Sequence, residues 1–132
     1  MRPDALLVEL CHDSGVACTV LIVDDHAGFR SFARGLLQGE GFDVVGDAAD
    51  GGSALIAAAR LLPQLVLLDV QLPDFDGFEV ARRIAEWPSG PAVVLISSRD
   101  ASSYRRRLVG TSARGFITKS DLSAAALVPL VG

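Results

Sequence analysis

The sequence predicts an α/β protein with a five-stranded parallel sheet and helices on both faces. Its 132 residues, half of them apolar, can build one domain with a core but are too few for two domains of ordinary size. Short apolar runs alternate five times with segments of helical spacing. The runs are continuous rather than alternating, as expected for strands covered on both faces. This alternation favours right-handed crossovers between parallel strands.

The first two strands are predicted at 18–24, "CTVLIVD", and at 42–48, "FDVVGDA". One face of a helix follows the first strand and is formed by Phe29, Phe32, Ala33, Leu36 and Leu37. A second helix, over 54–62, should stop at Pro63, because the residue before a proline disfavours the helical conformation.

The remaining strands are predicted at 64–69, 92–98 and 113–119. A third helix over 80–87 follows the first of these. The fourth helix, over 101–108, has only a weak apolar pattern, which indicates low local stability. A short fifth helix is expected after the last strand, with Ser120 or Asp121 as its N-terminal cap.

Residues 1–17 lie outside this pattern and are predicted to be an N-terminal extension to a domain over 18–132. Cys11 and Cys18 lack the partners of a disulfide framework or a zinc site, so we expect reduced thiols in a cytoplasmic protein. No window approaches the apolar length of a membrane span. The net charge of −4 argues against nucleic-acid binding, and the arginine run 105–107 is interpreted as a solvated helix face.

Polar residues stand at the predicted strand ends: Asp24, Asp25, Asp69, Ser97 and Lys119. The carboxyl ends of strands in an open parallel sheet are where functional groups gather. Clustered carboxylates must hold a proton or recruit a cation, and an all-oxygen set suits Mg²⁺. His26 adjoins the acids but is expected to face solvent rather than to bind the metal.

A hydroxyl from Ser97 and an ammonium from Lys119 are groups that could hold the oxygens of a transferred phosphoryl group. Asp69 would then be the nucleophile that forms an acyl phosphate. For Lys119 alone, a plain salt bridge to the acids is an equally good interpretation.

At these residues the chain resembles the receiver domain of two-component response regulators. The matching pieces are "LIVDDH" (21–26), "LVLLDVQLPDFDGFEV" (65–80), "VVLISS" (93–98) and "GFITKSDL" (115–122). The resemblance covers about residues 18 to 131 and is closest to the LuxR/NarL-type subfamily. It implies a flavodoxin-like fold with strand order 2-1-3-4-5.

The resemblance also implies a role for each site residue. Asp69 would accept a phosphoryl group from a sensor histidine kinase, and Ser97 and Lys119 would bind its oxygens. Asp24 and Asp25 would serve a Mg²⁺ site, with Asp25 as a direct ligand beside Asp69 and the backbone carbonyl of Gln71. Phe116 matches the aromatic switch position.

The implied protein is a signalling switch, not an enzyme acting on other substrates. Its output would pass through the fourth helix and the fifth strand to an effector domain or a second copy of the chain. A phosphorylation-independent binding module is the alternative. An aspartyl phosphatase is disfavoured, because Gln71 stands where that pattern has a second acid. No helix-turn-helix follows, so DNA binding is not expected of this chain.

The segment after Asp69 needs a tight turn, which Pro73 and Gly77 permit. Asp74 and Asp76 are predicted to be turn and cap residues. Ser120 replaces a proline that many receivers carry after the lysine in a cis peptide bond. We therefore expect either a trans bond or a strained one at Ser120.

Overall fold

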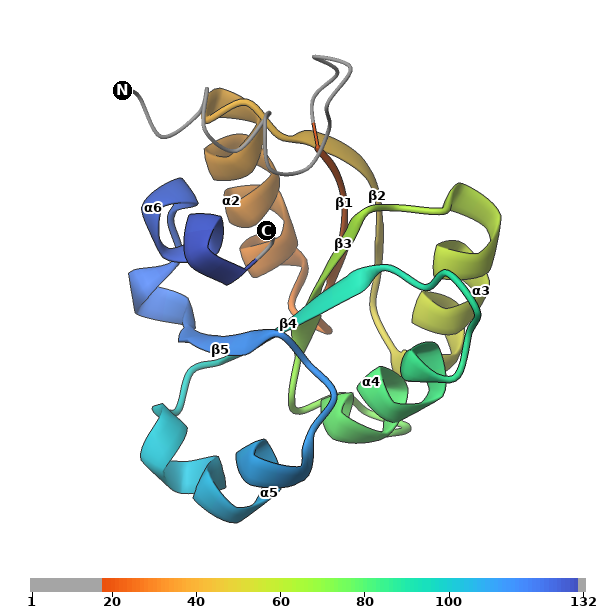
Figure 1. The fold of residues 1–132 in the computed structure, drawn as a ribbon. Helices are drawn as coiled ribbons and strands as arrows, with labels where there is room; N and C mark the ends of the chain where they lie inside the picture. Colours follow the sequence, from red (N-terminus) through yellow and green to blue (C-terminus); the bar gives the residue numbers. More distant parts are fainter. Residues whose placement is uncertain (1–17, 131–132) are drawn as a thin grey trace.

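Five parallel strands form one sheet in the order β2-β1-β3-β4-β5 (Figure 1). The computed structural model describes residues 18–130. The strands are β1 (Thr19–Val23), β2 (Asp43–Ala48), β3 (Leu65–Asp69), β4 (Ala92–Ser97) and β5 (Gly115–Thr118). The predicted fold class and strand order are confirmed.

Helices cover both faces of the sheet (Figure 1). On one face lie α2 (Ala27–Gly39) and α6 (Ala124–Leu127). On the other lie α3 (Gly51–Leu61), α4 (Gly77–Ala85) and the short α5 (Arg105–Gly110).

Alternate side chains of the central strands feed two separate cores. On β1, Val20 and Ile22 point to the core under α2, while Leu21 and Val23 point to the core under α3. All four side chains are fully buried. This two-sided burial explains why the strands are continuous apolar runs in the sequence.

The ends of two helices follow from local sequence. Helix α3 ends at Leu61, and Leu62 adopts a left-handed conformation with φ 49° just before Pro63. Helix α2 ends at Gly39, and Gly41 has φ 102°, a value that glycine adopts without strain. The predicted stop at Pro63 is confirmed.

Two predicted helices differ from the structure. The fourth begins as a 3₁₀ turn, Ala101–Tyr104, before α5 starts at Arg105. After β5 another 3₁₀ turn occupies Lys119–Asp121, so α6 begins later than predicted. Its cap is Ser123, whose Oγ accepts from the main-chain N of Ala126 at 3.1 Å. The assignment of Ser120 or Asp121 as the cap is therefore wrong.

Other predictions concern features besides the helices and strands. Cys18 forms a disulfide, so a reduced thiol at this position is wrong. Cys11 and the predicted extension, residues 1–17, lie outside the described residues. Within 18–130 every peptide bond is trans, including the bond before Ser120. Among the described helices, none has the length and hydropathy needed to cross a membrane.

Candidate functional site

The register of β1 and β3 brings two buried carboxylates side by side. Val23 pairs with Leu68, so Asp24 and Asp69, one residue further along each strand, end the strands together. Asp24 is 0% exposed and Asp69 is 3% exposed. Two charged groups are thus held at the edge of the apolar core, where each needs a compensating partner.

Asp25 and His26 complete a cluster with Asp24 and Asp69. One ligand atom from each of the four residues lies within 4.8 Å of all the others. The His26 side chain is 73% exposed, in line with the solvent-facing position predicted for it. Its Nδ1 nevertheless lies 3.2 Å from Oδ1 of Asp24 and 3.0 Å from Oδ1 of Asp25.

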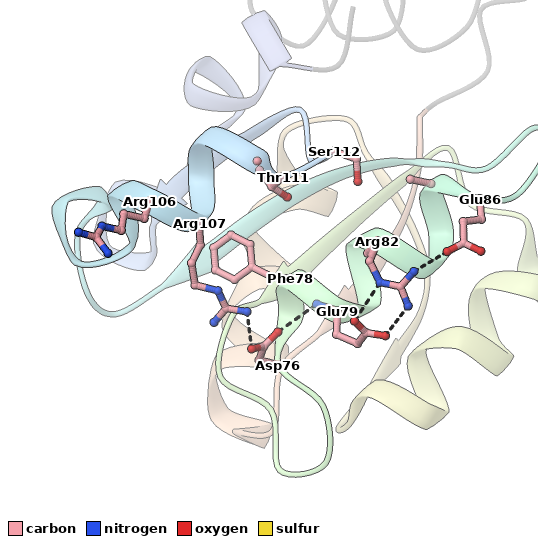
Figure 2. A pocket seen from close by; sticks show the side chains of 11 residues that line it. Asp76, Phe78, Glu79, Arg82, Glu86, Arg106, Arg107, Thr111 and Ser112 are labelled. Carbon is pink, nitrogen blue, oxygen red and sulfur yellow. Dashed lines mark hydrogen bonds and ion pairs between the residues drawn. The ribbon is translucent and has the colours of Figure 1, made fainter.

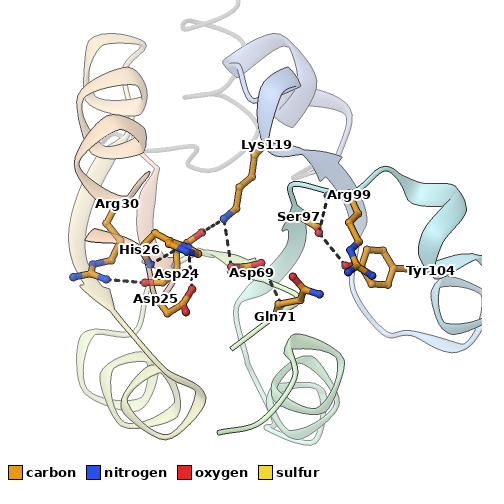
Figure 3. Close-up of polar contacts among 10 residues, drawn as sticks. All are labelled: Asp24, Asp25, His26, Arg30, Asp69, Gln71, Ser97, Arg99, Tyr104 and Lys119. Carbon is orange, nitrogen blue, oxygen red and sulfur yellow. Dashed lines mark hydrogen bonds and ion pairs between the residues drawn. The ribbon is translucent and has the colours of Figure 1, made fainter. Parts of the chain in front are cut away.

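Lys119 joins the cluster from the end of β5 and bridges its two buried acids (Figure 3). Its Nζ lies 2.5 Å from Oδ2 of Asp24 and 3.4 Å from Oδ2 of Asp69. The same nitrogen stands 4.6 Å from the ring centroid of Phe29, a cation–π distance. Burial alone would lower the pKa of Lys119, but the two carboxylates outweigh it and raise that pKa.

The ionisation of Asp69 carries an electrostatic cost. Burial raises its pKa to about 6, the charge of Asp24 adds to this, and the Gln71 main-chain hydrogen bond and Lys119 oppose it. The buried Oδ2 of Asp24 has the Lys119 ammonium 2.5 Å away, but the two buried carboxylates share that single positive charge. Crowded carboxylate oxygens with a remaining need for positive charge fit Mg²⁺.

Gln71 lies beside Asp69, as predicted. Its main-chain N donates to Oδ1 of Asp69 at 3.2 Å. This bond places the main-chain N of residue 71 at the cluster, and the role of its backbone carbonyl as a metal ligand stays a prediction.

Ser97 lies at the end of β4 and is 1% exposed, but its hydrogen bonds are to residues outside the carboxylate cluster. Its Oγ accepts from the main-chain N of Arg99 at 3.1 Å and lies 3.0 Å from the hydroxyl of Tyr104 (Figure 3). Phe116, on β5, packs against Tyr104 with ring centroids 5.7 Å apart. The structure thus brings Asp24, Asp25 and Asp69 close together and joins Lys119 to Asp24 and Asp69, while Ser97 and Phe116 form a second group around Tyr104.

Asp74 and Asp76 fasten the loop between β3 and α4. Asp76 caps its own helix, accepting from the main-chain N of Glu79 at 3.0 Å. Asp74 instead caps α3: its two carboxylate oxygens accept from the main-chain N of Gly51 at 2.7 Å and of Gly52 at 2.9 Å. These bonds lower the pKa of Asp74. The loop that follows Asp69 is therefore tied to a neighbouring helix.

Asp74→Asn should lower the melting temperature at neutral pH, because an amide cannot accept from both main-chain groups. The lowered pKa in the folded state means that the stabilisation is present above the unfolded value of 3.8 and is lost as pH falls below it. Thermal unfolding across pH checks this: the difference from wild type should shrink in acid. The exposed Asp43→Asn is the control, and a difference independent of pH would contradict the capping role.

A groove of about 610 Å³ lies between α4 and α5, away from the carboxylate cluster (Figure 2). Ion pairs link five of its six charged lining residues. Arg82 pairs with Glu79 at 2.7 Å and with Glu86 at 2.6 Å, and Arg107 pairs with Asp76 at 2.5 Å. The groove thus links α5 to the start of α4 rather than presenting a set of unpaired charges.

Sequence reasoning missed three partners of the site. Phe29 was assigned only to a helix face, Tyr104 only to an apolar position of a weak helix, and Asp74 to a local turn. Each acts through a contact with a residue far away in sequence or across a loop. The one available signal was that Tyr104 is the single tyrosine of the chain.

Comparison with known proteins gives a family match over most of the chain. The pattern of the response regulator receiver domain matches residues 20–128. The response regulator GacA of Pseudomonas protegens is 35% identical over 101 residues, which are 76% of this chain and 47% of that protein. The chain spans about half the length of the curated relatives it matches.

Solved structures agree with this match. A LuxR-family two-component response regulator from Aurantimonas sp. is 30% identical with a TM-score of 0.75, covering 86% of this chain and 81% of that one. A CheX–CheY–BeF₃–Mg²⁺ complex from Borrelia burgdorferi contains a chain that is 30% identical with a TM-score of 0.75. That match covers 90% of both chains.

Proposed function

Because this chain belongs to the response regulator receiver family, we propose that it is a phosphorylation switch whose Asp69 accepts a phosphoryl group from a sensor histidine kinase. The observation that carries the proposal is the contact of Lys119 with both Asp69 and Asp24 at the carboxyl ends of three parallel strands. One nucleophile, a second acid and one ammonium are thereby held within contact distance.

In the transfer, an oxygen of the ionised Asp69 carboxylate attacks the phosphorus of a phosphohistidine. The new P–O bond forms as the P–N bond breaks, and the departing nitrogen keeps the electron pair and takes a proton from water. With a pKa of about 6, Asp69 is mostly ionised at neutral pH, so the nucleophile is in its reactive form.

Asp24, Asp25, Asp69 and the Gln71 backbone carbonyl would hold Mg²⁺, which when bound offsets negative charge on the acids and on the phosphoryl oxygens. Lys119 already contacts Asp69 and can bind a phosphoryl oxygen after transfer. Ser97 would supply a hydroxyl to another oxygen. The similar CheY complex is described with BeF₃ and Mg²⁺, which is in keeping with this assignment.

The output would pass from Ser97 through Phe116 and α5 to a partner, either an effector domain or a second copy of the chain. Helix α5 suits a moving element because none of its residues is buried. The receiver domain is proposed to span 18–132, after an extension over 1–17. The cytoplasmic location expected from the sequence stays a prediction.

Incubation with Mg²⁺ and acetyl phosphate should add one phosphoryl group to the protein, measured by intact mass. Asp69→Asn should abolish the product, because an amide cannot act as the nucleophile. Asp43→Asn, at an exposed position away from the site, should keep it. Labelling that survives Asp69→Asn would remove Asp69 from this role, and no labelling of the wild type would favour a phosphorylation-independent module.

A further inference from the structure

Tyr104 connects the candidate phosphorylation site with the start of α5. It is 9% exposed and ends the 3₁₀ turn that leads directly into the helix. Its hydroxyl lies 3.0 Å from Oγ of Ser97, a buried contact. The helix itself has no buried residue, so this side chain is a main point at which the segment is fixed to the sheet.

The ring of Tyr104 sits between two other aromatic rings. Its centroid is 6.0 Å from that of Phe78 on α4 and 5.7 Å from that of Phe116 on β5. Arg107, from α5, covers Phe78 at 4.2 Å and reaches Asp76 (Figure 2). A movement of Tyr104 would therefore disturb contacts to α4, β5 and α5 together.

The hydrogen-bonding capacity of Ser97 is limited. A serine hydroxyl offers one proton and two lone pairs. The main-chain N of Arg99 occupies one lone pair, and Tyr104 takes either the proton or the other lone pair. Among the described residues, Ser97 Oγ makes no bond to Asp69 or Lys119; its partners lie on the side of α5 (Figure 3).

We propose that Tyr104 is a latch: in the unphosphorylated arrangement Ser97 donates its proton to the Tyr104 hydroxyl, and a phosphoryl group on Asp69 competes for the same proton. The inference rests on the proposed function. A phosphoryl oxygen only accepts, so it takes the Ser97 proton and draws the side chain toward Asp69. Tyr104 then loses its partner, its ring leaves Phe116, and α5 is released. Tyr104 is a positioning residue, since it acts through Ser97.

Tyr104→Phe keeps the ring and removes the latch. The variant should bind beryllofluoride, a phosphoryl mimic, about threefold to tenfold more tightly than the wild type in the presence of Mg²⁺, the worth of one neutral hydrogen bond. Equal or weaker binding would overturn the latch, because the Tyr104 hydroxyl would then not oppose the binding of a phosphoryl group.

The same substitution in a Ser97→Ala background separates the latch from a general packing role. Without the serine hydroxyl there is nothing to hold, so Tyr104→Phe should leave beryllofluoride affinity unchanged there. An equal gain in both backgrounds would mean that the tyrosine acts independently of Ser97, which contradicts the proposal.

Fluorine NMR can follow beryllofluoride binding and the change around Tyr104 in one sample. The chain has a single tyrosine, so 3-fluorotyrosine gives one protein resonance, and bound beryllofluoride gives its own signals. We expect the tyrosine resonance to shift when the bound signals appear. Bound signals without a shift would overturn the latch alone, whereas no bound signals with Mg²⁺ present would overturn the proposed function and the latch with it.

Discussion

Asp69→Asn should raise the free energy of unfolding by about 2 kcal/mol at about pH 7.5, while it removes phosphoryl transfer. The reason is the cost of keeping an ionised carboxylate buried beside Asp24, which raises the pKa of Asp69 to about 6. An asparagine of the same shape carries no charge and escapes this cost, although it gives up the attraction of Lys119. A functional residue would thus lower the stability of its own fold.

The pH dependence of this gain has a definite sign. The pKa of Asp69 is 3.8 in the unfolded chain and about 6 in the folded protein, so the cost is absent below about pH 4 and complete above about pH 6. Urea unfolding at several pH values should show the variant and the wild type separating across this window. Added Mg²⁺ should narrow the gap, because a cation that binds only the native wild type stabilises it.

Asp43→Asn serves as the control, because that aspartate is exposed. It should change stability little and should respond little to Mg²⁺. A wild type that is as stable as Asp69→Asn at neutral pH would contradict the electrostatic account of the site.

Gly77→Ala should lower the free energy of unfolding by about 3 kcal/mol and weaken phosphoryl transfer as well. A Cβ at this position would collide with the backbone oxygen of Asp69 and would lie 2.9 Å from Cα of Val70. The main chain cannot simply rotate away, because the N of Gly77 donates to the oxygen of Val70 at 2.7 Å. Relief of the clash must move the strand end that carries Asp69.

Gly35→Ala provides the matched control on α2. Nothing lies within 4 Å of a Cβ added there, so alanine should stabilise the helix by about 0.5–1 kcal/mol. Urea unfolding followed by the fluorescence of Trp87 measures both variants, and acetyl phosphate labelling measures the site. A Gly77→Ala protein with wild-type stability would show that the turn can open at little cost.

The fold and the carboxylate cluster could be predicted because both depend on local sequence. Each strand is a continuous apolar run, and Asp24, Asp69 and Lys119 directly follow or end strands whose register then places them together. The apolar runs and the polar residues that end them are therefore enough to predict the sheet and the cluster, and side-chain packing need not be known.

The missed features depend on tertiary contacts, or on 3₁₀ turns that change the direction of the following side chains. The spacing of apolar residues in the sequence reports neither. Asp74 looks like a turn residue, yet its partners are the main-chain groups of α3. Tyr104 lies in a 3₁₀ turn, so helical spacing misplaces its side chain. The cap of α6 moved to Ser123 because another 3₁₀ turn delays the helix.

The two flanks of Asp69 are held with unequal strength. On the α3 side, Asp74 accepts hydrogen bonds from the main-chain N–H groups of Gly51 and Gly52 at the start of the helix. The α5 side is held by the Tyr104–Ser97 hydroxyl contact and by one exposed ion pair, Arg107 with Asp76. The Tyr104 ring also packs against Phe78 and Phe116. Because no residue of α5 is buried, the α5 side of the site should move more readily than the α3 side, and we expect a partner that distinguishes the phosphorylated form to contact the α5 side.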